Sequence, residues 1–259
     1  MHELVDSHIH LDHASFAADR DEVIARARAS GVEALVIPAV DRHSWPGIRQ
    51  MCSSGRSLYP AYGVHPLFVE HHAATDVHEL SAWLGAGDAV AIGEIGLDFH
   101  EQAPDRDTQR HFFKAQLQQA REHKLPVIVH ARAAFEEVIL TLRDAGTLRG
   151  VVHSFSGSQE QASRLWDMGF CLGIGGPVTY PRARRLRQIV ANMPAEFLLL
   201  ESDAPDQPDA DIRGQRNEPA RVAMIAQCVA DLRGEPLSAL AATTTANANR
   251  LFGIDNRRR

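Results

Sequence analysis

Apolar runs alternate with longer stretches of helical periodicity along the whole chain. Eight runs are rich in aliphatic and β-branched residues and have the length of buried strands in a parallel sheet. We expect strands over 5–10, 32–40, 58–65, 89–95, 126–130, 150–155, 170–174 and 197–203. Between and after them, apolar residues recur at helical spacing, which predicts helices over 19–30, 44–54, 76–84, 107–123, 135–145, 159–168, 181–192, 219–233 and 237–251.

This regular alternation predicts one parallel α/β domain that spans residues 1–259. Eight strand–helix units in a chain of this length favour a closed (β/α)8 barrel, the TIM barrel. An open, doubly wound sheet is the alternative, but the chain has no glycine-rich phosphate loop after its first strand. Residues 204–218 are polar and rich in proline and aspartate, which indicates a long loop, and 256–259 should form a frayed basic tail.

Composition and charge narrow the class of protein. The chain is 44% hydrophobic and 23% charged, as in globular proteins with a full core. No apolar run approaches the ~18 residues of a membrane span, the N-terminus lacks a secretory pattern, and the three cysteines are widely spaced. We therefore expect a cytoplasmic protein without a membrane partner. The net charge of -6 argues against electrostatic coating of nucleic acid, but allows an enzyme that contacts one phosphate.

Ionisable residues stand at the ends of most of the expected strands. The first strand carries His8 and His10, and its alternation places both imidazoles on one face. Five further strand ends carry an ionisable side chain: His65, Glu94, His130, His153 and Asp203. In a barrel these ends meet at one rim, where the active sites of this fold lie. A single histidine is more often a packed, hydrogen-bonded residue, but this whole group buried without a cation would carry a large desolvation cost.

The donor types in this group suit divalent metal ions. Four histidines and two carboxylates provide nitrogen and oxygen ligands: His8, His10, His130, His153, Glu94 and Asp203. Six ligands exceed the four of a tetrahedral zinc site, so we expect two metal ions per subunit with Glu94 shared between them. The mixed donors allow Zn, Mn, Fe or Ni, and also Mg at the position richer in carboxylate.

Several ordered motifs carry a specific resemblance to a known family. They read His-Ile-His-Leu at 8–11 after Asp6, Gly-Glu-Ile-Gly-Leu-Asp at 93–98, Pro-Val-Ile-Val-His-Ala-Arg at 126–132, His-Ser-Phe-Ser-Gly at 153–157 and Glu-Ser-Asp-Ala-Pro at 201–205. Three more read Gly-Val-His-Pro at 63–66, Asn-Glu-Pro at 217–219 and Asn-Ala-Asn-Arg-Leu-Phe at 247–252. Together they resemble the signatures of the TatD family of metal-dependent deoxyribonucleases over the whole chain. The resemblance implies an amidohydrolase-like TIM barrel that hydrolyses phosphodiesters with one to three metal ions.

The segment after Asp203 departs from the commoner pattern of this family. It reads Asp206-Gln207-Pro208-Asp209, where aromatic and aliphatic residues are more usual. With Ser202 present and Ala-Pro kept at 204–205, the chain is more similar to the YjjV-like branch of the family. The departure bears on the substrate and not on metal-dependent hydrolysis.

Two residues are expected to be catalytic and two to bind substrate. Asp203 should bind metal and take the proton from the attacking water, and Glu94 should bridge the two ions; a loop cap and a solvated carboxylate are the alternatives. His65 should either hydrogen-bond a substrate phosphate or only pin the turn that follows it. Arg132 is a candidate phosphate clamp, with a surface ion pair as the alternative, and Asp98 should hold a ligand in place.

The leading hypothesis is a hydrolase that cleaves phosphodiester bonds of DNA ends by metal-activated water, in the manner of a 3′→5′ exonuclease. A single-stranded or frayed 3′ end would enter the mouth, which a mildly acidic chain tolerates. The alternative keeps the site and changes the bond to an ester or amide, such as a lactone or an aminoacyl-tRNA linkage. The complete ligand set disfavours a catalytically silent barrel. Because a closed barrel leaves no sheet edge, we expect a monomer without an obligate protein partner.

Overall fold

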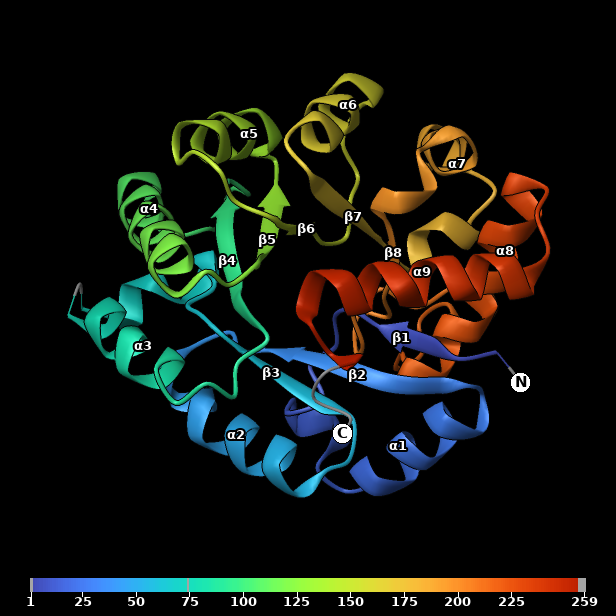
Figure 1. Ribbon diagram of the computed structural model, residues 1–259, viewed down its shortest axis with the longest axis horizontal. Coiled ribbons are helices and arrows are strands. Elements are labelled where there is room, and N and C mark those ends of the chain that lie inside the picture. Colours follow the sequence, from blue (N-terminus) through green and yellow to red (C-terminus); the bar gives the residue numbers. More distant parts are fainter. Residues whose placement is uncertain (1, 74, 256–259) are drawn as a thin grey trace.

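The computed structural model describes residues 2–73 and 75–255. Its eight strands form one parallel sheet, in which each strand pairs with the next along the chain (Figure 1). The strands are β1 (Leu4–Asp6), β2 (Val32–Pro38), β3 (Leu58–Tyr62), β4 (Ala91–Asp98), β5 (Val127–Arg132), β6 (Gly150–Val152), β7 (Phe170–Ile174) and β8 (Leu198–Leu200). The expected basic tail at 256–259 lies outside the described residues.

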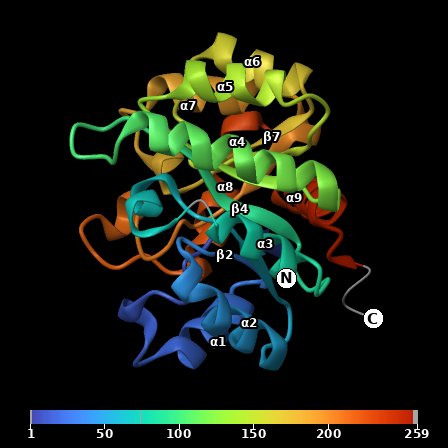
Figure 2. The same cartoon turned by 90° about the vertical axis from the view of Figure 1, so that its left-hand side faces the viewer.

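A helix follows every strand, and one more helix is added after the eighth unit. The helices are α1 (Arg20–Ala29), α2 (Trp45–Ser54), α3 (Asp76–Leu84), α4 (Arg106–His123), α5 (Phe135–Asp144), α6 (Gln159–Asp167), α7 (Arg184–Asn192), α8 (Val222–Arg233) and α9 (Leu237–Phe252). The perpendicular view shows α5, α6 and α7 at one end of the molecule and α1 and α2 at the other, so the helices ring the strands (Figure 2). Within the described ranges, no helix is both long and apolar enough to cross a bilayer.

The ring closes between β8 and β1 through hydrogen bonds just beyond the strand ends. The Ser7 amide donates to the Leu200 carbonyl at 3.0 Å. Asp6 is fully buried and accepts from both the amide and the hydroxyl of Ser202, at 2.9 and 2.6 Å. These contacts satisfy backbone groups that an open sheet would leave at its edges. The barrel expected from the sequence is confirmed, and the doubly wound alternative is wrong.

Two apolar layers hold the barrel together. The larger lies between the strands and the surrounding helices, and the smaller fills the barrel with side chains such as Val5, Val36, Ile128 and Leu199. Helix α9 crosses the barrel in Figure 1 and adds Leu251, Phe252 and Ile254 to the smaller cluster. The buried side chain of Asn247 fixes this helix by donating to the carbonyls of Ala195 and Leu198, at 2.7 and 2.9 Å. The amino ends of the strands are thereby covered, and the carboxyl ends form the open rim.

Five strands end earlier than the apolar pattern predicts, and in four of them, β1, β3, β6 and β8, this moves predicted site residues into the segments that follow. The side chains concerned are His8, His10, His65, His153 and Asp203. The expectation that His8 and His10 lie on a strand is therefore wrong. The backbone still follows the sheet in two of these segments, because their amides bond to neighbouring strands: Ile9 donates to the Val36 carbonyl at 3.1 Å, and His153 donates to the Val129 carbonyl at 3.0 Å. The imidazoles of His8 and His10 therefore still lie on the same side, as predicted, with their Nε2 atoms 3.2 Å apart.

Candidate metal centre

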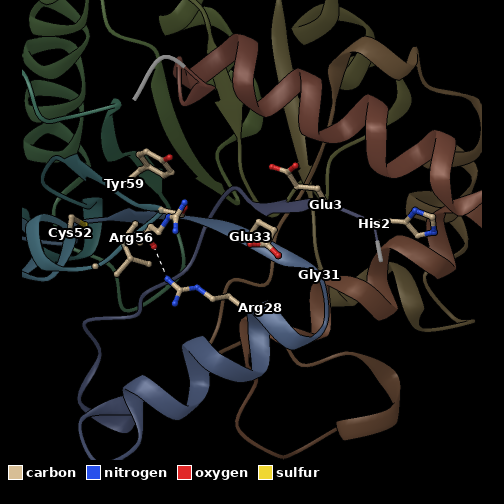
Figure 3. A pocket seen from close by; sticks show the side chains of 11 residues that line it. His2, Glu3, Arg28, Gly31, Glu33, Cys52, Arg56 and Tyr59 are labelled. Atoms are coloured by element: carbon tan, nitrogen blue, oxygen red, sulfur yellow. Dashed lines mark hydrogen bonds between the residues drawn. The ribbon is translucent and has the colours of Figure 1, made fainter. Parts of the chain in front are cut away.

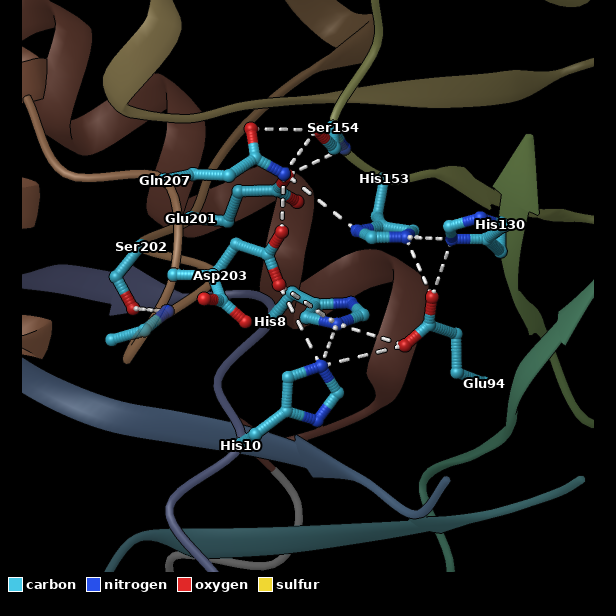
Figure 4. A network of polar contacts seen from close by, with 12 residues as sticks. His8, His10, Glu94, His130, His153, Ser154, Glu201, Ser202, Asp203 and Gln207 are labelled. Carbon is cyan, nitrogen blue, oxygen red and sulfur yellow. Dashed lines mark hydrogen bonds and ion pairs between the residues drawn. The ribbon is translucent and has the colours of Figure 1, made fainter. Parts of the chain in front are cut away.

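The six residues expected to bind metal meet at the carboxyl ends of the strands (Figure 4). They surround the floor of a cavity of about 620 Å³, which His10, Glu94, His130, His153 and Asp203 line. His8 is completely buried beside them. The cavity therefore opens onto nitrogen and oxygen donors contributed by five separate parts of the barrel.

One set of donors, here called the first donor group, consists of His8, His10, Glu94 and Asp203. Nε2 of His8 and Nε2 of His10 lie 3.2 Å apart. Oε2 of Glu94 lies 3.3 and 3.5 Å from these two nitrogens, and Oδ1 of Asp203 lies 3.5 and 3.6 Å from them. Bonds of about 2.1 Å to a tetrahedral metal ion separate neighbouring donors by about 3.4 Å. The spacing of the first donor group therefore fits one divalent ion.

The other carboxylate oxygen of Glu94 faces a second donor group, completed by His130 and His153. Oε1 lies 2.9 Å from Nδ1 of His130 and 2.7 Å from Nε2 of His153. The two imidazole nitrogens are 3.2 Å apart. These three donors leave room for further ligands, as a catalytic metal site requires. Because the two oxygens of Glu94 point to different groups, the carboxylate is placed to bridge two ions.

The hydrogen bonds of the histidine rings show which ring nitrogen carries the proton and which keeps a lone pair for a metal ion. Nε2 of His130 lies 3.0 Å from the buried Asp98 carboxylate, so this nitrogen carries the proton and Nδ1 keeps its lone pair for a metal. His65 shows the opposite pattern, because its Nδ1 accepts the Leu67 amide at 3.1 Å. Its Nε2, 3.2 Å from Oε1 of Glu94, must then carry the proton. His65 therefore pins the following turn and directs its N–H at Glu94, while its ring lines the cavity.

The electrostatics of the cluster favour a cation beside Glu94. Burial raises the pKa of Glu94, but His153, His65 and His8 outweigh this and hold it well below its usual range. Burial lowers the pKa of His153, but the charge of Glu94 prevails and raises it to about 10. For His8, burial and the neighbouring His153 lower the pKa to about 4, so its ring is neutral and can donate a lone pair. The donor set fits divalent metal ions.

A third carboxylate, Glu201, lies fully buried behind both donor groups. Its Oε1 accepts the Ser154 amide at 2.5 Å and lies 3.9 Å from Nδ1 of His153. A ring nitrogen of His8, one of His153 and a carboxylate oxygen of Glu201 also lie within 4.8 Å of one another. Burial raises the pKa of Glu201 to about 8. Glu201 thus faces the rear of two histidines that use Nε2 in the donor groups.

The sequence-based prediction misses three residues that support the cluster. Asp6 fixes the segment that carries His8, since it accepts the His8 amide at 3.2 Å in addition to its contacts with Ser202. Glu201 enters the prediction only as part of a motif, and Gln207 only as part of an unusual loop. A signal exists for the first two, because buried acidic residues that flank predicted ligands commonly orient them. No comparable pattern marks Gln207.

The walls of the cavity differ in chemistry. Leu67 and Phe68 form an apolar lip, and Leu67 is 39% exposed although its side chain is apolar. Arg132 lies on the lining with a side chain that is 56% exposed, and its guanidinium is 4.0 Å from the Asp98 carboxylate. This contact is too long and too exposed to fix the guanidinium in place. The cavity therefore combines metal donors, one adjustable cation and an apolar surface.

A second hollow of about 720 Å³ lies at the opposite end of the barrel, where the strands begin (Figure 3). Its lining mixes acidic and basic side chains, including Glu33, Arg28 and Arg56. Arg28 donates to the Arg56 carbonyl at 2.8 Å, which ties α1 to the loop before β3. None of the predicted site residues lines this hollow. They lie instead at the cavity at the carboxyl ends of the strands.

Comparisons with known proteins cover almost the whole chain. A model of the TatD-related DNase family matches residues 5–253. Metal-dependent hydrolase YjjV of Escherichia coli K12 is 35% identical over 253 residues, which cover 96% of this chain and 98% of that protein. The crystal structure of YjjV, a TatD homologue, matches with a TM-score of 0.93 at 34% identity and covers 96% of this chain and 98% of that one. A 3′-5′ ssDNA/RNA exonuclease TatD of Citrobacter koseri is 35% identical over 258 residues, 97% of this chain and 99% of that protein.

Proposed function

Given that this chain belongs to the TatD family of metal-dependent hydrolases, we propose that it cleaves phosphodiester bonds at single-stranded or frayed 3′ ends of DNA. The observation that carries the proposal is the position of Glu94, whose two oxygens face two donor groups at the floor of one cavity. Two divalent ions held there would neutralise phosphate charge and lower the pKa of a water molecule. The 3′-5′ ssDNA/RNA exonuclease named among the relatives supports a nucleic acid as substrate.

The proposed ligands divide between the two ions. His8, His10 and Asp203 would hold one ion, His130 and His153 the other, and Glu94 would contact both. Zn, Mg and Mn are the expected candidates, since the first donor group contains more carboxylate than the second. The side chains of Glu94 and His8 are almost completely buried. Neither could turn out into solvent unless the barrel opened. This rigidity keeps the two groups at a fixed separation.

Asp203 is the proposed proton acceptor of the reaction. Its Oδ1 points at the first donor group, and about one tenth of its side chain is exposed to the cavity. A water molecule that enters beside the ions would therefore lie within reach of this carboxylate, which can accept the proton as the phosphorus–oxygen bond forms. Replacing the carboxylate by an amide would keep the shape of the side chain and remove this acceptor.

The substrate would be held by groups around the rim. Arg132 is free to move its planar guanidinium onto a phosphate, where two parallel hydrogen bonds are available. His65 would share its Nε2–H, which faces Oε1 of Glu94 at 3.2 Å, with a phosphate oxygen, and its ring is fixed by the Leu67 amide. Leu67 and Phe68 provide an apolar surface on which a terminal base can stack. Only the end of a strand needs to enter the cavity, so the net charge of -6 does not prevent binding.

Metal-stripped and reloaded protein tests the proposal with single-stranded DNA that carries a label at its 5′ end. With Mg, Mn or Zn, we expect stepwise shortening from the 3′ end, and a 3′-terminal phosphorothioate should stop it. Asp203→Asn should lose this activity, whereas Asp211→Asn, a change at an exposed aspartate of the same loop, should retain it. A metal-loaded enzyme that leaves DNA intact but hydrolyses lactones or aryl esters would overturn the proposal.

A further inference from the structure

Gln207 connects the two donor groups through its side-chain amide. Its Nε2 donates a short hydrogen bond to Oδ2 of Asp203, the carboxylate oxygen that does not face His8 and His10. The same amide group contacts the Ser154 hydroxyl, with Oγ 2.6 Å from Nε2 and 2.9 Å from Oε1. Ser154 directly follows His153 of the second donor group. Figure 4 shows the amide between these two side chains.

The orientation of the amide follows from its neighbours. If the amide were turned over, Oε1 would face the carboxylate of Asp203, and two acceptors would lie in contact without a proton between them. In the observed orientation the Ser154 hydroxyl can donate to Oε1, while Nε2 donates to Oδ2 of Asp203 and to the Ser154 oxygen. The amide nitrogen is therefore the end that meets the carboxylate.

The backbone of Gln207 is held on several sides. The buried side chain of Asn217 donates to the carbonyl of Asp206 at 2.8 Å and to that of Gln207 at 3.4 Å. Gly176 lies against the Gln207 carbonyl so closely that any Cβ there would collide with it. These contacts fix where the side chain starts, at a point from which its amide reaches Asp203.

Ser154, Asp203 and Gln207 all adopt left-handed backbone conformations, with φ of 47°, 54° and 49°. Residues other than glycine rarely adopt this region, and they do so where surrounding contacts impose it. Here the three residues are the members of one hydrogen-bonded set. The strained backbone therefore lies at the residues whose side chains form this hydrogen-bonded set, next to both donor groups.

From these contacts we propose that Gln207 is a positioning residue, which holds Asp203 with only Oδ1 turned toward the first metal ion. This inference rests on the proposed metal-dependent function of the same site. Without the amide, the carboxylate could rotate and bind the ion through both oxygens or turn away from it. The loop at 206–209 is also where the sequence departs from the commoner family pattern, and an aliphatic side chain there could not donate this hydrogen bond.

Metal affinity and the spectrum of bound Co2+ test the proposal without any substrate. Gln207→Met keeps the length of the side chain and removes the donor. We expect a 10- to 100-fold weaker affinity for the first ion and an altered visible Co2+ spectrum, because orienting hydrogen bonds of metal ligands have effects of about this size. Gln207→Glu should weaken binding at least as much, since it retains the shape but places an acceptor against Asp203. Gln215→Met, an exposed glutamine of the same loop, is the matched control and should match the wild type.

Ser154→Ala provides a second route if the changes at Gln207 impair folding. It removes the hydroxyl that braces the amide, so it should weaken metal binding in the same direction by a smaller factor. The double variant should bind no more weakly than Gln207→Met alone. With DNA, Gln207→Met should lower kcat while KM stays within about twofold of the wild type. Unchanged metal affinity and spectrum in both variants would overturn the inference, whereas a metal effect in a protein inactive on DNA would overturn only the proposed function.

Discussion

Nε2 of His130 lies 3.0 Å from Oδ2 of Asp98, while Nδ1 of the same ring faces Glu94. The Asp98 carboxylate is itself fixed, since its Oδ1 accepts the His100 amide at 2.9 Å. A fully buried acceptor on one nitrogen fixes which nitrogen is available to a metal ion. The geometry of the second donor group therefore depends on Asp98, a residue that is not itself one of its donors.

Asp98→Ala should weaken metal binding at the second donor group more than at the first. His130 would then lose the partner that fixes its tautomer, and we expect a 10- to 100-fold loss of affinity at this position. A competition titration against a chromophoric zinc chelator measures the two affinities. Glu101→Gln, at an exposed position of the same loop, is the control. Two unchanged affinities in Asp98→Ala would show that the ring is oriented by other contacts.

Phe68→Ala should impair binding of DNA without impairing chemistry. Phe68 lies on the lip of the cavity and packs edge-on against His65, with ring centroids 6.1 Å apart. Loss of one base-stacking partner corresponds to about tenfold in affinity, so KM for single-stranded DNA should rise by about this factor at nearly constant kcat. Met224→Ala, a change at an exposed apolar residue on α8, should leave KM unchanged. A fall in kcat alone would argue against a stacking role.

The contact between Asp209 and Arg221 predicts a pH-dependent part of the stability. Burial raises the pKa of Asp209, but hydrogen bonds from Arg221, one of them 2.8 Å long, outweigh this and keep it below its usual value. A carboxyl with a lower pKa in the folded state stabilises the fold above its unfolded pKa of about 3.9. That contribution is lost as the pH falls through the folded pKa.

Urea unfolding between pH 3 and pH 7 checks this contribution. Asp209→Asn should be less stable than the wild type by about 2 kcal/mol at pH 7, as expected for a hydrogen bond to a charged group. The difference should shrink below pH 4. Asp211→Asn is the control, because this exposed carboxylate contacts the same arginine at 3.4 Å and should have little effect. A difference that stays constant down to pH 3 would contradict the ion-pair explanation.

Asn247→Ala should destabilise the closed end of the barrel. The variant leaves the carbonyls of Ala195 and Leu198 without their donor in a buried setting, at a cost of about 2 kcal/mol. Thermal unfolding measures the change, with Thr243→Ala on the same helix as a control. Metal affinity should remain that of the wild type, because α9 covers the end of the barrel opposite to the metal centre.

The order of elements and most of the candidate metal centre could be predicted from the sequence. Strand and helix periods differ clearly, and the ends of parallel strands meet at one rim, so the pattern alone places His130 and Glu94 together. The exact ends of the strands could not be predicted. Residues 7–10 stay extended beyond β1, and an apolar pattern does not distinguish an extended segment from a paired strand.

Contacts within the long loop were also beyond prediction. Gln207 reaches Asp203 and Ser154 because Asn217 and Gly176 hold the loop in an irregular path. Such a path has no period that a sequence pattern could show. The position of Glu94 between the two donor groups was predictable in outline, whereas the tautomers of His65 and His130 required the positions of their hydrogen-bond partners.

Anomalous diffraction from a crystal soaked with Mn2+ would test the two-ion centre most directly. Two peaks are expected in each subunit, on either side of Glu94, one beside His8, His10 and Asp203 and the other beside His130 and His153. A single peak, or a second peak that is not in contact with Glu94, would contradict a centre in which this carboxylate bridges two ions.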